Sequence, residues 1–111
     1  MEIIMTRKEK DALIVSVKGK MDTVSAPEFE KKLAEWIEEG ENNFVIDLAE
    51  LDYISSSGLR CILATAKKLK TKNGQIFLSS LQDVVKEVFD ISGFSTIIPI
   101  SESVEAALAK I

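Results

Sequence analysis

Three consecutive serines, Ser55, Ser56 and Ser57, form the stretch of this sequence whose residue types and spacing most directly suggest chemistry. They follow an apolar run at residues 44–48 and lead through Gly58 into a segment with helical periodicity. We expect Ser57 to be the N-cap of that helix, where backbone N–H groups lack partners and the helix dipole favours a phosphate. Ser57 is therefore the predicted phosphoacceptor, with Gly58 leaving its hydroxyl accessible. In the simpler alternative, Ser57 only caps the helix.

Two charged residues could act together with Ser57. Arg60 would be the third residue of the helix, where the dipole disfavours a cation, so it could pair with a phosphate on Ser57 or with an acidic partner. A solvated arginine is an equally good interpretation. Asp22, which follows an alternating apolar segment, could brace a loop or contact a partner.

The composition excludes most catalytic and metal-binding chemistry. The chain of 111 residues contains no histidine and a single cysteine, Cys61. It therefore lacks a Ser-His-Asp triad, a His-assisted thiol and a Cys/His metal site, and it contains no G-x-G-x-x-G or Walker A motif. We predict a binding protein that is not an enzyme, has no catalytic residue and needs no metal or cofactor.

Charge and hydropathy limit the cellular environments and the classes of partner that are compatible with the sequence. A net charge of −4 argues against non-specific nucleic-acid binding, and no apolar run is long enough to cross a bilayer. The amino terminus lacks the apolar block of a signal peptide, and one cysteine cannot support a disulfide framework. We expect a protein of an intracellular, reducing environment that binds proteins or small molecules, with no nucleic-acid partner and no membrane insertion.

Hydrophobic periodicity and turn residues place the candidate residues on an α/β fold. The order ββαβαβαβα predicts one domain over residues 1–111, with a mixed, mostly parallel sheet and helices packed against it. The first helix should begin with a capping box formed by Ser25 and Glu28. The other helices should begin at Ser57, Ser80 and Ser101, and the strands should cover residues 2–7, 12–18, 44–48, 75–78 and 96–100.

The predicted topology brings distant residues together. Loops that leave the carboxyl ends of parallel strands gather at one edge of a sheet, where binding sites form. That edge would collect residues 20–24, 49–58 and 79–80. Asp22 and Ser57 should therefore be near neighbours.

Asp47 offers a different interpretation of the same edge. It ends a central strand, as the phosphoacceptor aspartate of a receiver domain does. However, residues 3–5 contain no acidic pair, and Ser101 and Glu102, not a lysine, follow the last predicted strand. We therefore interpret Asp47 as an acid that stabilises its loop.

Four motifs occur in a fixed order along the chain and are followed by a terminal amphipathic helix. The motifs are GKMD at residues 19–22, SSSGLR at 55–60, NGQIFLSSL at 73–81 and VFDISGF at 88–94. In these motifs the sequence resembles the anti-sigma factor antagonist family, the bacterial STAS domains. The resemblance implies a cytoplasmic partner-switching protein that binds an anti-sigma factor, itself a serine kinase, and so frees a sigma factor. It further implies that phosphorylation of Ser57 abolishes binding and that a serine phosphatase restores it.

The resemblance also implies a partner-binding surface and points to one departure from the family. Many members carry Asp where this chain has Ser55, which makes Ser56 a secondary candidate for phosphorylation. Two other functions remain open on the same residues: a STAS scaffold of a lipid-transport or sensory complex that is never phosphorylated, and a nucleotide-binding module. The implied partner-binding residues are Asp22, Thr23, Ser55, Ser56, Ser57, Gly58 and Arg60.

Overall fold

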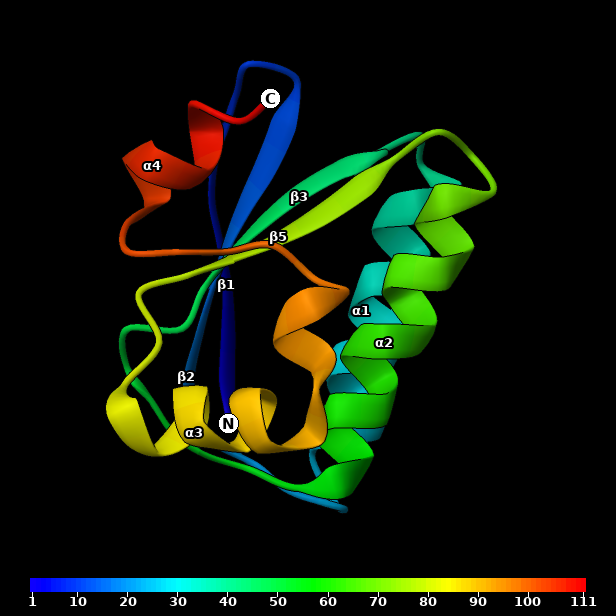
Figure 1. Cartoon of the computed structure of the whole chain (residues 1–111). Helices are drawn as coiled ribbons and strands as arrows, with labels where there is room; N and C mark the ends of the chain where they lie inside the picture. The colour runs from blue at the N-terminus through cyan, green and yellow to red at the C-terminus, as the bar shows by residue number, and fades with distance from the viewer.

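A sheet of six strands organises the chain, and the computed structural model describes all 111 residues (Figure 1). The strands are β1 (Glu2–Glu9), β2 (Ala12–Met21), β3 (Asn43–Asp47), β4 (Leu51–Ile54), β5 (Gln75–Ser79) and β6 (Ile100–Ser101). The helices are α1 (Ala26–Glu38), α2 (Ser56–Lys70), α3 (Asp83–Ser92) and α4 (Val104–Leu108), with a 3-10 turn, η1 (Phe94–Thr96), after α3.

The strand order confirms the predicted mixed, mostly parallel sheet. It runs β1-β2-β3-β5-β6, and only the β1–β2 hairpin is antiparallel. β2 is long enough to pair twice. Its residues 13–16 lie beside β3, and its end, Gly19–Met21, lies beside β4.

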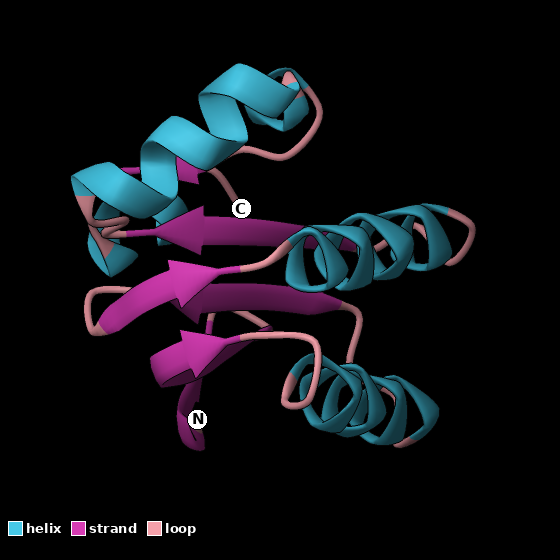
Figure 2. Cartoon of the chain, turned by 90° about the horizontal axis from the view of Figure 1, so that it is seen from below, coloured by secondary structure: helices cyan, strands magenta, loops and turns pink.

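Helices cover both faces of the sheet, so the central strands are buried on both sides (Figures 1 and 2). The two faces differ in how much of them is covered. The larger core lies under α1, α2 and α3, where Phe29, Ile62 and Phe89 are fully buried against the sheet. On the other face, α4 packs Ala107 and Leu108 over a smaller cluster. The predicted buried character of residues 44–48 follows from this arrangement.

Two strands differ from the prediction. β2 continues through Met21, so residues 19–21 are strand and not loop. β4 was expected as loop because its sequence is short and mixed in polarity. It forms because the extended end of β2 offers its backbone for pairing.

The first helix begins directly after Ser25, as predicted, but without the predicted capping box, and the third helix begins later than predicted. Ser25 precedes α1, but its side chain makes no capping hydrogen bond to the helix, so the predicted capping box with Glu28 is wrong. α3 begins at Asp83 and not at Ser80. Ser80 has a φ of 61°, which no right-handed helix accommodates.

The carboxyl-terminal elements are shorter than predicted. Residues 94–96 form η1, and the last strand contains only Ile100 and Ser101, so the predicted strand at 96–100 is mostly wrong. Ser101 therefore pairs with Ser79 in the sheet and does not cap the final helix. Ser103 is the cap, because its Oγ accepts a hydrogen bond from the Ala106 N–H at 3.0 Å.

We predict that Gly74→Ala destabilises the fold by about 1–3 kcal/mol, because an added Cβ would overlap the backbone carbonyl of Asn42 and approach Leu69 Cδ2 to 3.2 Å. Backbone cannot move aside as a side-chain end can. Urea unfolding measures the change, with Lys72→Ala, at an exposed turn residue, as the control. Equal stability of the two variants would show that the close approach of these loops is not required.

Candidate functional site

Ser55, and not Ser57, is the N-cap of α2. Ser55 has extended backbone angles (φ −88°, ψ 171°), and its Oγ accepts a hydrogen bond from the Gly58 N–H at 3.2 Å. Ser56 and Ser57 are consequently the first two residues of the helix. The prediction that Ser57 caps the helix is wrong by two residues, because only Ser55 combines an extended backbone with a side chain that accepts a hydrogen bond from the third helical N–H.

The start of α2 is joined directly to the end of β2. The Ser55 N–H donates to the Met21 carbonyl oxygen at 2.8 Å. Gly58 is buried, and a Cβ at that position would lie 2.8 Å from Ile54 Cγ1 and 2.9 Å from Met21 Sδ. Gly58 therefore allows the helix to approach the sheet closely, and this close packing is a different role from the predicted one of leaving the serine hydroxyl accessible.

Ser57 is half-buried, and its hydroxyl makes no hydrogen bond to another group of the chain. It lines an open hollow of about 420 Å³ together with Thr23 from the β2–α1 turn and Arg60. The β2–α1 turn, which contains Asp22 and Thr23, therefore lies beside the start of α2, and the two distant segments come together as the topology predicted. Ser56 is exposed, and its hydroxyl also makes no hydrogen bond to the chain.

Asp22 braces the β2–α1 turn. Its Oδ1 accepts hydrogen bonds from the N–H groups of Val24 (3.1 Å) and Ser25 (2.9 Å), and the Ser25 hydroxyl lies 2.9 Å from the same oxygen. The backbone hydrogen bond from Ser25, followed by its hydroxyl, holds the pKa of Asp22 below the ordinary value of 3.8. Bracing is thus the observed role of one carboxylate oxygen, whereas Oδ2 makes no hydrogen bond within the chain.

Arg60 is the fifth residue of α2, and not the third as expected from a cap at Ser57. It is exposed, forms no ion pair in the chain and lines the same hollow as Ser57. The first turn of α2 contains no acidic residue, whereas α1, α3 and α4 each have one there. The positive end of the α2 dipole therefore has no neutralising carboxylate of its own.

Two residues of the hollow with titratable side chains were not among the predicted site residues. Glu30 of α1 and Cys61 of α2 both line it. Glu30 lies one helical turn after Ala26, which is buried at the start of α1, and this spacing was the available signal. Burial, followed by the charge of Glu30, raises the pKa of the Cys61 thiol to about 12.

Asp47 behaves as the sequence indicated. Its Oδ1 accepts a hydrogen bond from the Ala49 N–H at 3.0 Å, so the carboxylate stabilises the turn after β3. This confirms the interpretation of Asp47 as a loop-stabilising acid.

Comparison with known proteins relates this geometry to one family. The model of the STAS domain matches residues 3–107. A Bordetella bronchiseptica protein named as a candidate anti-sigma factor antagonist, BtrV, is 44% identical over 97 residues, covering 87% of this chain and 84% of the relative. The anti-sigma-B factor antagonist of Bacillus subtilis is 30% identical over 102 residues, covering 92% and 93%.

A solved structure shares the fold. The anti-sigma factor antagonist SpoIIAA in its unphosphorylated form superposes with a TM-score of 0.84 at 18% identity, over 98% of this chain and 95% of that chain. The phosphorylated Bacillus form gives a TM-score of 0.76 at 17% identity, over 98% of each chain. None of the α-helices described above is both long and apolar enough to cross a bilayer.

We predict that native Cys61 is alkylated by iodoacetamide about a hundredfold or more slowly than in the urea-unfolded chain, because a raised pKa leaves almost no thiolate near neutral pH. Only 4% of Cys61 is exposed, which slows the reagent further. Mass spectrometry of timed samples measures both rates. Similar rates in the folded and unfolded chain would contradict the burial described here.

We also predict that Asp22→Asn lowers the free energy of unfolding at neutral pH but not in acid. A lowered folded-state pKa stabilises the fold above pH 3.8, and this stabilisation is lost as the pH falls through the pKa of the folded protein. Urea titrations between neutral and acid pH test this, with Asp52→Asn, an exposed residue that accepts no side-chain hydrogen bond, as the control. A difference that persists unchanged in acid would contradict the bracing role.

Proposed function

The chain belongs to the STAS domain family, and we propose that it is an anti-sigma factor antagonist switched by phosphorylation of Ser57. In its unphosphorylated form it binds an anti-sigma factor that is also a serine kinase, and thereby releases a sigma factor. The kinase returns the chain to the unbound state by modifying Ser57, and a serine phosphatase restores binding. These steps take place in the cytoplasm, and the chain itself catalyses none of them.

The single observation that carries the proposal is the free hydroxyl of Ser57 on an open surface at the start of α2. The adjacent Ser55 hydroxyl is already engaged as the cap, so capping does not explain Ser57. A phosphate adds about −1.5 to −2 charges, and the helix terminus, which lacks an acidic residue in its first turn, can accommodate them.

The same charge acts against a bound partner. The partner-binding surface that we propose consists of the β2–α1 turn, with Asp22 and Thr23, and of the first turns of α2, with Ser56, Ser57 and Arg60. A partner surface complementary to a neutral hydroxyl loses contact when a dianion occupies that position. Ser55 and Gly58 contribute indirectly, since both are engaged in holding the helix against β2.

The similar proteins support the assignment of this chain to the class of anti-sigma factor antagonists. Two relatives, which are 44% and 30% identical to this chain, are named as anti-sigma factor antagonists. The structure of SpoIIAA, which shares the fold, has been solved in phosphorylated and unphosphorylated forms. The exposed hydroxyl of Ser56 makes it the secondary candidate for phosphorylation.

We predict that Ser57→Asp weakens binding to the cognate anti-sigma kinase about tenfold or more, whereas Ser57→Ala binds normally and is no longer phosphorylated. Candidate kinases are incubated with the chain and ATP, the phosphate is mapped by mass spectrometry, and affinities are measured by titration calorimetry. Ala106→Asp, which adds the same charge at an exposed position of α4, is the matched control.

Three results would overturn the proposal. One is a phosphate mapped outside residues 56 and 57. Another is equal affinity of Ser57→Asp and Ser57→Ala, which is the behaviour of a scaffold that is never phosphorylated. The third is an equal loss of affinity in Ala106→Asp, which would show a general charge effect.

A further inference from the structure

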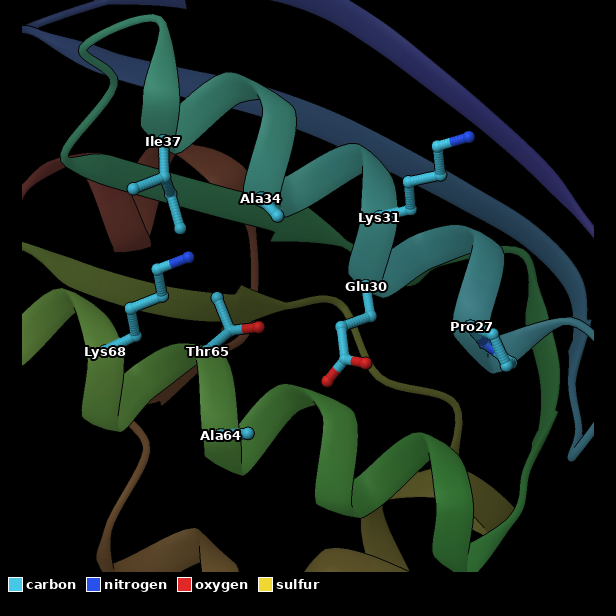
Figure 3. A pocket seen from close by; sticks show the side chains of 8 residues that line it. All are labelled: Pro27, Glu30, Lys31, Ala34, Ile37, Ala64, Thr65 and Lys68. Carbon is cyan, nitrogen blue, oxygen red and sulfur yellow. The ribbon is translucent and has the colours of Figure 1, made fainter.

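The hollow beside Ser57 continues between α1 and α2. A second hollow, of about 380 Å³, shares Pro27, Glu30 and Ala64 with the first and extends to Ile37 and Lys68. We call the two hollows together the α1–α2 groove. In Figure 3 the side chains of Glu30 and Lys68 are directed into the space between the helices, whereas Lys31 points away from it.

One wall of the α1–α2 groove is formed by three evenly spaced residues of α2. Arg60, Ala64 and Lys68 are spaced four residues apart, so they lie one above the other on the same side of the helix. Arg60 and Lys68 are therefore separated by about 12 Å along the helix axis. The small side chain of Ala64 between them, with Ala34 opposite on α1, leaves room for another chain.

The charge of this wall is unusual for the molecule. The chain carries a net charge of −4, yet α2 contains no acidic residue from Ser56 to Lys70. Neither Arg60 nor Lys68 forms an ion pair, although Glu30 faces the same groove. The helix dipole favours Lys68 in the last turn but disfavours Arg60 near the amino-terminal end, so the dipole alone does not account for the two cations.

We propose that the anti-sigma factor that recognises Ser57 places an acidic segment in the α1–α2 groove, with carboxylates on Arg60 and Lys68. This inference rests on the proposed function and adds the chemistry of the partner. Two carboxylates about 12 Å apart correspond to about eight residues on a helix or about four in an extended strand. Between them, a hydrogen-bond donor of the partner meets Glu30.

The acidic segment also gives the Ser57 switch a local mechanism. A phosphate on Ser57 lies in the hollow that Arg60 lines, so it pairs with Arg60 and removes one of the two cations from the partner. It also repels the nearest carboxylate of the segment. Both effects expel an acidic occupant, and neither requires the helix to move.

Lys68→Glu and Lys70→Glu form a matched pair that tests the groove. Both residues are exposed lysines in the last turn of α2, but Lys70 lines a separate hollow with Ala66 and Gly74. The probe is the kinase shown to phosphorylate Ser57, in complex with a non-hydrolysable ATP analogue. The affinity of the kinase for each variant is measured at about 50 mM and about 200 mM salt, because attraction between exposed charges is screened more strongly at the higher concentration.

We expect Lys68→Glu to weaken binding about tenfold at the lower salt concentration and less at the higher one, whereas Lys70→Glu stays within about twofold of the unmodified chain. Thermal denaturation confirms that both variants are folded. Equal affinities of the two variants, or a loss for Lys68→Glu that does not depend on salt, would overturn the groove as the acidic docking site.

Ser57→Asp in the same assay separates this inference from the proposed function. If Ser57→Asp loses affinity while Lys68→Glu matches Lys70→Glu, the groove proposal is wrong and the switch stands. If Lys68→Glu loses affinity while Ser57→Asp binds normally, the groove binds the partner and the proposed switch is wrong.

Discussion

The junction between the end of β2 and the start of α2 is the constraint on which the rest of the site depends. Ser55 makes it with two bonds, one from its N–H to the Met21 carbonyl oxygen and one from the Gly58 N–H to its hydroxyl. The absence of a side chain at Gly58 allows the helix to pack directly on Met21 and Ile54. The helix is thereby fixed to the sheet without using the Ser57 hydroxyl, which remains free for a partner or a phosphoryl group.

Residues at this edge of the sheet divide into those that hold the surface and those that form it. Ser55, Gly58 and one oxygen of Asp22 are occupied by contacts within the chain. The side chains of Ser57 and Arg60 make no hydrogen bond or ion pair within the chain, and both line a common hollow. A surface built in this way can change its charge without losing a bond that supports the fold, and the proposed switch requires this property.

The sequence was sufficient for the architecture because periodicity and strand–helix alternation determine it, and these also placed the β2–α1 turn beside the serines. The first residue of each helix was harder to predict, since several nearby serines are each suitable as the N-cap. Ser55 was chosen over Ser57, and Ser103 over Ser101, by backbone angles and strand pairing that are set by tertiary contacts. The short strand β4 depends on the extension of β2, and the α1–α2 groove depends on the packing of two helices, so neither could be predicted from local sequence.

The central claim is that charge on Ser57 alters the surface and leaves the fold unchanged. Two-dimensional ¹H–¹⁵N spectra of the isolated chain, recorded before and after stoichiometric phosphorylation of Ser57, test it most directly. The account predicts shifts confined to Thr23 and residues 55–61, with the resonances of β3 and β5 unmoved. Shifts throughout the central strands, or a loss of spectral dispersion, would contradict it.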